Sequence, residues 1–134
     1  MKTIERMKQT DNPRLYSPLT LAHLGDAVYE LLVREHVCQQ SMPAHTAHKK
    51  TVAMVRCQYQ AQVYDAIYDG LTEEEQDIMR RGRNSSTVKV PKNAGCMEYR
   101  KATGVEALFG YLYLKREYER IDALFQKALA FEQK

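Results

Sequence analysis

The chain has 134 residues, of which 44% are hydrophobic and 28% charged, and its net charge is +3. This length fits one domain, and the composition excludes disordered chains, collagen-like repeats and disulfide-rich scaffolds. No apolar stretch reaches the roughly 20 residues that span a bilayer. Glycine and proline are scarce, and the three cysteines show no CxxC spacing. We therefore expect one mostly helical domain over residues 1–134, in the cytoplasm and without a membrane partner, with an N-terminal arm at residues 1–16.

The first expected helix begins at a serine followed by a proline. Ser17 is the predicted N-cap and Pro18 the first helical residue, and the apolar pattern continues to about Gln40. Apolar residues lie on both sides of this helix, which predicts that it lies inside the domain. Asp26 and Glu30, one turn apart, would then face a cleft or an interface.

Two further helices are expected before a long loop. Pro43 opens one that the pattern extends to about Asp69, with Gly70 as its C-terminal cap. Thr72 and the three glutamates after it predict an N-cap and a capping box for the next helix. We expect that helix to end near Gly82.

Residues 83–96 are expected to form a basic loop. Residues 80–101 carry a net charge of +6, and the rest of the chain carries −3. A loop of this length in a compact domain is usually functional, and a basic strip on an acidic body indicates a polyanionic partner. A solvated loop without a partner is the alternative. The candidates for RNA contacts are Arg81, Arg83, Lys89, Lys92 and Arg100.

The remaining chain is expected to form a helix from about Met97 and a final amphipathic helix beyond Arg116. No segment shows the alternation of a strand, so the fold class is all-α, a helical bundle. The phosphate-binding loops GxxxxGK and GxGxxG are absent, so we expect no nucleotide cofactor. His45 and His48, one turn apart, could form half of a metal site, but no third ligand lies near them in the sequence.

Glu106 is the only charged residue in residues 105–114. Burying a lone carboxylate costs several kcal/mol unless it is neutralised or finds a cation. The cation could be a divalent metal, or it could be an arginine such as Arg34 or Arg100. Both readings stay open on the sequence alone.

Asp26 follows a glycine in the first helix. Gly25 would cost about 1 kcal/mol relative to alanine at such a position, so it indicates close approach by another helix or by a ligand. Carboxylates that converge from two helices suit Mg²⁺, with water and phosphate oxygens completing its coordination. Glu30 could join them, or it could pair with Arg34 four residues later.

Two segments together resemble the ribonuclease III catalytic domain. LAHLGDAV at residues 21–28 is similar to its signature helix, and VEALFG at residues 105–110 is similar to its second acidic helix. Matches along nearly the whole chain are closer to the Mini-ribonuclease III subgroup, which lacks the double-stranded-RNA-binding domain. They include GDAVYE at 25–30, HKK at 48–50, RGRN at 81–84 and PKN at 91–93.

This resemblance implies a homodimeric endonuclease for double-stranded RNA that uses Mg²⁺, with Mn²⁺ as a substitute. It implies Asp26 as the principal catalytic carboxylate and Glu106 as the matching metal ligand. The implied substrate is the precursor of large-subunit (23S) ribosomal RNA. Ala22 and Thr103 stand where larger members of the family carry carboxylates. The number of metal ions is therefore left open.

Two other functions are left open as well. One is a non-catalytic RNA-binding or ribosome-assembly protein on the same fold, with activity weakened at Ala22 and Thr103. The other is a helical dimerisation module whose carboxylates form only ion pairs. Carboxylates retained at the apolar sites of Asp26 and Glu106 favour catalysis, and a dimerisation module would leave the basic strip without a role. We expect the dimer surface on the first helix, with a contribution from residues 111–114.

Overall fold

Helices account for nearly all of the chain that the structure, a computed structural model, describes, namely residues 12–85 and 96–133. The all-α prediction is confirmed over these residues. None of the helices in these two ranges is long and apolar enough to cross a membrane. In chain order they are η1 (Pro13–Leu15), α2 (Pro18–Cys38), α3 (Ala44–Val55), α4 (Cys57–Ile67), η2 (Tyr68–Gly70), α5 (Glu73–Asn84), α6 (Cys96–Leu114), α7 (Tyr118–Ala128) and η3 (Leu129–Phe131).

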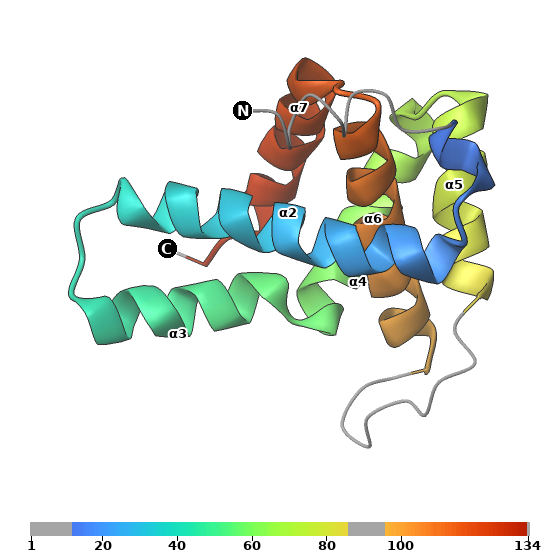
Figure 1. The fold of residues 1–134 in the computed structure, drawn as a ribbon. Helices are drawn as coiled ribbons and strands as arrows, with labels where there is room; N and C mark the ends of the chain where they lie inside the picture. Colours follow the sequence, from blue (N-terminus) through green and yellow to red (C-terminus); the bar gives the residue numbers. More distant parts are fainter. Residues whose placement is uncertain (1–11, 86–95, 134) are drawn as a thin grey trace.

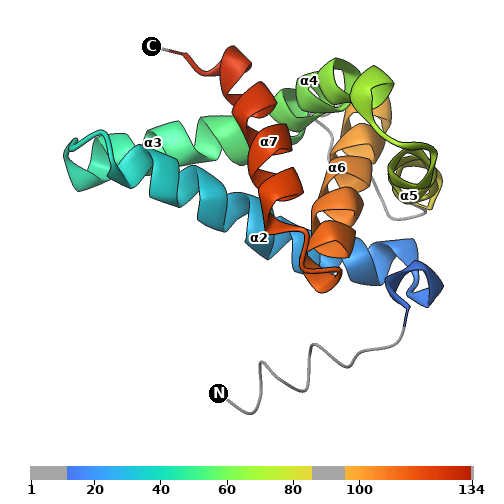
Figure 2. The same ribbon diagram turned by 90° about the horizontal axis from the view of Figure 1, so that it is seen from above.

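Helix α6 lies at the centre of the fold, in contact with α2, α4, α5 and α7 (Figures 1 and 2). Val105, Leu108, Phe109 and Leu112 are fully buried. A helix that is apolar all round is stable only when other elements surround it, and the sequence of α6 meets that condition. The interior helix is therefore α6.

Helix α2 does not lie inside the domain, so that prediction is wrong. Ser17 caps it as expected, because its hydroxyl accepts a hydrogen bond from the backbone N–H of Thr20 at 3.1 Å. The face that packs on α6 is buried, and Tyr29 meets the ring of Phe109 edge-on at 5.5 Å. The opposite apolar face stays at the surface, where Leu31 is 67% exposed. The second apolar side of α2 is thus a surface.

The single helix predicted from Pro43 to about Asp69 is two helices. The chain breaks at Arg56, whose backbone is extended (ψ 157°). Helix α3 lies beside α2 in a hairpin that projects from the bundle, whereas α4 packs against α6 (Figure 1). The apolar pattern continues through the break, because both helices bury one face. The apolar periodicity of the sequence therefore does not reveal that the chain changes direction at Arg56.

The expected ends of α4 and α5 also differ from the structure. Gly70 lies in the η2 turn, and none of the glycines in residues 12–85 and 96–133 has a positive φ, so Gly70 is not a left-handed cap. The capping box at Thr72 and Glu75 is confirmed, with hydrogen bonds of 2.9 and 3.1 Å. Helix α5 continues past Gly82 to Asn84. A Cβ on Gly82 would lie 2.8 Å from that of Ala107, so this glycine allows close packing on α6.

The segment after α7 is tied to the α2–α3 hairpin by the Glu132 clamp, defined as Glu132 with His36, Gln40 and Lys50. The Glu132 side chain is 6% exposed. Its carboxylate lies 2.9 Å from Nε2 of His36 and accepts hydrogen bonds from Gln40 (2.9 Å) and Lys50 (2.7 Å). Burial opposes ionisation, but the bonds from Gln40, Lys50 and His36 lower the pKa of Glu132 to about 2. The clamp therefore remains charged at neutral pH.

Candidate active site

Helices α2 and α6 cross with their backbones almost in contact. A Cβ on Gly25 would lie 1.6 Å from the carbonyl oxygen of Glu106, and a Cβ on Gly110 would lie 2.1 Å from that of Leu21. Only glycine fits at either position. The prediction that Gly25 allows another helix to approach is confirmed. The crossing places Asp26, the next residue of α2, beside Glu106 of α6.

Asp26 and Glu106 form a carboxyl pair in hydrogen-bond contact. Asp26 is exposed, whereas Glu106 is mostly buried. Burial and the neighbouring charge of Asp26 raise the pKa of Glu106 to about 8, and a hydrogen bond from Gln60 opposes this rise. The pair therefore retains a proton at neutral pH unless a cation takes its place.

Neither arginine that the sequence offered as a partner neutralises Glu106. Arg34 forms an ion pair with Glu30 at 2.8 Å, so Glu30 follows the simpler of its two predicted roles. Nε of Arg100 is buried and has no hydrogen-bond partner within the described residues. In the same part of the chain no ion pair to Glu106 is formed. The buried ion-pair reading is thus not supported there.

The carboxyl pair fits a magnesium ion better than it fits a metal held by protein ligands alone. Mg²⁺ is commonly held by one or two carboxylates, while water and substrate phosphate supply the remaining oxygens. In residues 12–85 and 96–133 no group of three or more His, Cys, Asp or Glu side chains could hold a metal. His45 and His48 therefore gain no third ligand there. A buried carboxyl that lacks a cation agrees with a site completed by a bound ion.

A pocket of about 290 Å³ lies beside Glu106, lined in part by Gln60, Tyr99 and Thr103. The Thr103 hydroxyl donates to the backbone carbonyl of Tyr99 at 3.1 Å, and Ala22 is buried in the core. Neither position adds a ligand to the pair. Gln60 is the residue that sequence reasoning missed, because a glutamine within an amphipathic helix gives no signal of contact with another helix.

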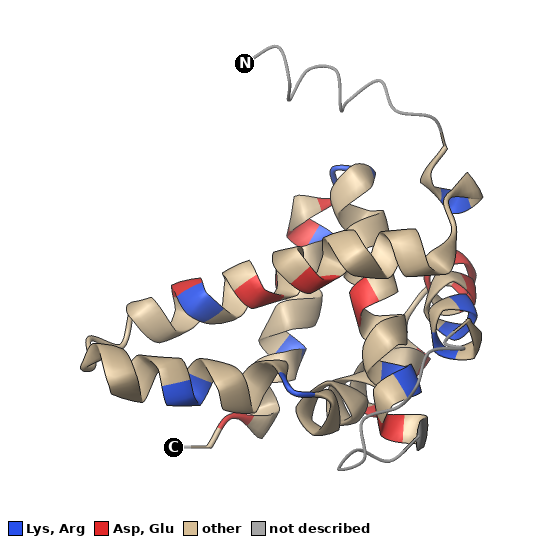
Figure 3. Ribbon diagram, turned by 60° about the horizontal axis from the view of Figure 1, so that its bottom comes forward, with Lys and Arg blue, Asp and Glu red and all other residues tan. Residues whose placement is uncertain are grey.

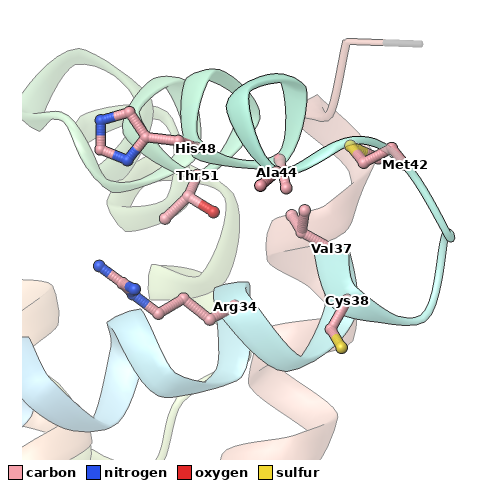
Figure 4. A pocket seen from close by; sticks show the side chains of 8 residues that line it. Arg34, Val37, Cys38, Met42, Ala44, His48 and Thr51 are labelled. Carbon is pink, nitrogen blue, oxygen red and sulfur yellow. The ribbon is translucent and has the colours of Figure 1, made fainter.

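A second pocket, of about 330 Å³, lies between α2 and α3 near the tip of their hairpin (Figure 4). Its lining is largely apolar, with Arg34, His48 and Thr51 at one end (Figure 4). No carboxylate of the described residues lines it. It therefore offers no metal site and is separate from the carboxyl pair.

Three of the five predicted RNA-contact residues, Arg81, Arg83 and Arg100, lie within the described part of the chain. Helix α5 carries both signs of charge (Figure 3), and Arg81 and Arg83 lie in its last turn, partly exposed. Arg81 donates to the backbone carbonyl of Arg14 at 3.2 Å, and Arg83 donates to the hydroxyl of Tyr64 at 3.1 Å. Arg100 is partly buried on α6. Lys89, Lys92 and most of the predicted basic loop lie outside the described residues, as do residues 1–11 of the N-terminal arm.

Comparison with known proteins matches the chain to the Ribonuclease III domain family over residues 19–117. It is 49% identical to the Mini-ribonuclease 3 of Thermoanaerobacter sp. (strain X514), over 82% of this chain and 78% of that protein. It is 42% identical to that of Symbiobacterium thermophilum, over 90% and 93%. Among solved structures, a crystal structure of a Fusobacterium nucleatum protein matches with a TM-score of 0.83 and 36% identity, over 90% and 93% of the two chains. The matched regions include both members of the carboxyl pair.

Proposed function

The chain belongs to the Mini-ribonuclease 3 family of ribonuclease III endoribonucleases, and we therefore propose that it cleaves double-stranded RNA at the carboxyl pair of Asp26 and Glu106 with the aid of Mg²⁺. One observation carries this assignment. A mostly buried glutamate touches an aspartate across two helices, without a cationic partner in the described residues. Such a pair costs stability in the free protein, and a bound divalent cation removes that cost.

Each member of the pair has its own task. Glu106 would hold the ion from its mostly buried position, while the exposed Asp26 would supply a second carboxylate at the surface. When bound, Mg²⁺ or Mn²⁺ stabilises charge on the scissile phosphate and acidifies a coordinated water. Few protein ligands leave coordination positions for water and for phosphate oxygens.

The substrate side of the proposal concerns the backbone of duplex RNA. The major groove of duplex RNA is too deep and narrow for side chains to read, so recognition depends on shape, phosphates and 2′-hydroxyls. Arg81 and Arg83, together with Lys89, Lys92 and Arg100, are the proposed phosphate contacts. We further propose that the natural substrate is the precursor of 23S ribosomal RNA in the cytoplasm. The resemblance to the family is the support for that step.

A homodimer completes the proposal, because two carboxyl pairs are needed to cut both strands. The surface of α2 that faces away from α6 carries the exposed Leu31 and, two turns earlier on the same face, the partly exposed Leu24. This exposed apolar surface supports a dimer through α2. Of residues 111–114, which were expected to contribute, Tyr111 and Leu112 are buried in the core, and only the partly exposed Tyr113 and Leu114 remain available.

The first test is cleavage of a long RNA duplex by the wild type and by an Asp26→Asn variant, in Mg²⁺ and in EDTA. We expect cutting only with Mg²⁺ and a loss of at least about a hundredfold in the variant, because several kcal/mol of transition-state stabilisation disappear. Asp122→Asn, an exposed aspartate on α7, is the matched control and should cut normally. Wild-type protein that binds the duplex but never cuts it, in any metal, would instead favour the non-catalytic RNA-binding function.

A further inference from the structure

Gln60 of α4 is one of the most deeply buried side chains in the described part of the protein, with 2% of its surface exposed. It is a polar residue among large apolar ones. Buried amides are normally satisfied by hydrogen bonds, so both ends of this side chain need partners.

The amide nitrogen of Gln60 has two acceptors. Nε2 donates to the carbonyl oxygen of Val55 at 2.8 Å and to Oε2 of Glu106 at 3.3 Å. Val55 is the last residue of α3, so the break at Arg56 presents this carbonyl to Gln60. The carbonyl also fixes the orientation of the amide, because a flipped side chain would place two acceptors against each other.

The amide oxygen of Gln60 is buried and has no hydrogen-bond partner in the described residues. A buried acceptor without a partner costs stability, because water that it could bind in the unfolded chain is not replaced. An apolar residue of the same size would avoid this cost. What glutamine provides and an apolar residue would not is the N–H donor that points at the Glu106 carboxyl.

We propose, on the basis of the function assigned above, that Gln60 is a positioning residue that holds the Glu106 carboxyl toward Asp26 for metal binding. The N–H of Gln60 donates to one oxygen of Glu106 at 3.3 Å and so fixes the direction in which this carboxyl points. The rest of the carboxylate is then free to face Asp26 and the cation. Partners that orient a metal ligand in this way typically change metal affinity by about 10- to 100-fold.

The test measures metal binding directly, with Mn²⁺ as the probe and electron paramagnetic resonance of the free ion as the readout. Gln60→Met keeps the volume of the side chain and removes its donor. We expect it to weaken Mn²⁺ binding by about 10- to 100-fold and to raise the Mg²⁺ concentration needed for cleavage more than it lowers the rate at saturation. Gln62→Met, an exposed glutamine on the same helix, is the control and should bind Mn²⁺ as the wild type does.

A merely structural role is separated by repeating the substitution in a Glu106→Gln background. If Gln60 acts through Glu106, Gln60→Met causes no further loss of Mn²⁺ binding there, whereas an equal loss in both backgrounds overturns the proposal. Equal Mn²⁺ affinity of the Gln60 and Gln62 variants overturns it too. If the wild type cuts RNA while either result holds, only the role of Gln60 fails. A wild type that neither binds metal nor cuts refutes the proposed function itself.

A second measurement does not depend on how the Gln60 variant folds. In wild-type protein, the side-chain amide protons of Gln60 should shift in NMR spectra when Mg²⁺ is added, while those of Gln62 should not. The shift should disappear in Asp26→Asn. If the amide signals of Gln60 do not shift when Mg²⁺ is added, the proposal is overturned even if no Gln60 variant can be purified.

Discussion

At Gly25 the space for a single methyl group is missing, because the carbonyl oxygen of Glu106 occupies the position of the Cβ. Gly110 makes the reciprocal contact with Leu21 on the other side of the crossing. Each glycine lies next to the carboxyl pair or one turn from it. The residues that decide the distance between the carboxyl groups are therefore residues without side chains.

Gly25→Ala is expected to destabilise the protein and to abolish cleavage together. The added methyl forces α2 and α6 apart, and such overpacking costs about 1–3 kcal/mol of unfolding free energy. Denaturant unfolding and the duplex-cleavage assay measure the two effects. Gly70→Ala is the matched control, since its Cβ would meet only the flexible end of Lys127 at 3.1 Å. Equal stability and activity in the two variants would contradict this account of the crossing.

The carboxyl pair could be predicted from the sequence, but its surroundings could not. Glu106 stands out because it is the only charge in an apolar segment, and Gly25 marks the close approach beside Asp26. Gln60 gives no such signal. Its contact with Glu106 depends on the direction of α4 after the break at Arg56, and that direction is set by tertiary packing.

At the scale of helices, caps were predictable where a side chain forms the cap. Ser17 and Thr72 start their helices as expected, because each hydroxyl binds a backbone N–H three residues on. The end of a helix was less predictable. Gly82 resembles a terminator in the sequence, but it serves close packing on α6, and the break at Arg56 has neither glycine nor proline. Packing, not local preference, decides these positions.

Helix α5 is the described element best placed to test the phosphate contacts. A guanidinium has five N–H donors, and the hydrogen bonds that Arg81 and Arg83 form within the described residues use only part of this capacity. In an Asp26→Asn background, Arg81→Ala with Arg83→Ala should weaken duplex binding and reduce its logarithmic salt slope by about 1–2, at about 0.9 per phosphate contact as for duplex DNA. Lys127→Ala on α7 is the control and should not change the slope. A double variant with the wild-type slope would remove both arginines from the proposed RNA surface.

At the scale of the whole molecule, the exposed face of α2 is the feature that a monomer does not explain. Leu31 is 67% exposed on this face, while the opposite face of the helix forms core. In a symmetric dimer each such residue meets the same surface of the second copy. A single substitution therefore acts twice at the interface.

Leu31→Lys is expected to convert a wild-type dimer into monomers, because it buries like charges across the two-fold axis at a cost of several kcal/mol. Sedimentation velocity should show at least about a hundredfold weaker association. Val52→Lys, a 48% exposed position on α3, is the control and should remain dimeric. A wild type that sediments as a monomer at micromolar concentration would contradict the proposed dimer, and a dimeric Leu31 variant would place the interface elsewhere.

The Glu132 clamp also orders events during synthesis. His36 and Glu132 are 96 residues apart in the chain, yet their side chains are 2.9 Å apart in the fold. At about 5–20 residues per second, the ribosome needs roughly 5–20 seconds to pass from one to the other. Helices α2 and α3 can form a nascent hairpin within that interval through local contacts alone. Glu132, the charged partner of this hairpin, emerges only after α6 and α7. The first hairpin to be translated therefore receives its ion pairs last.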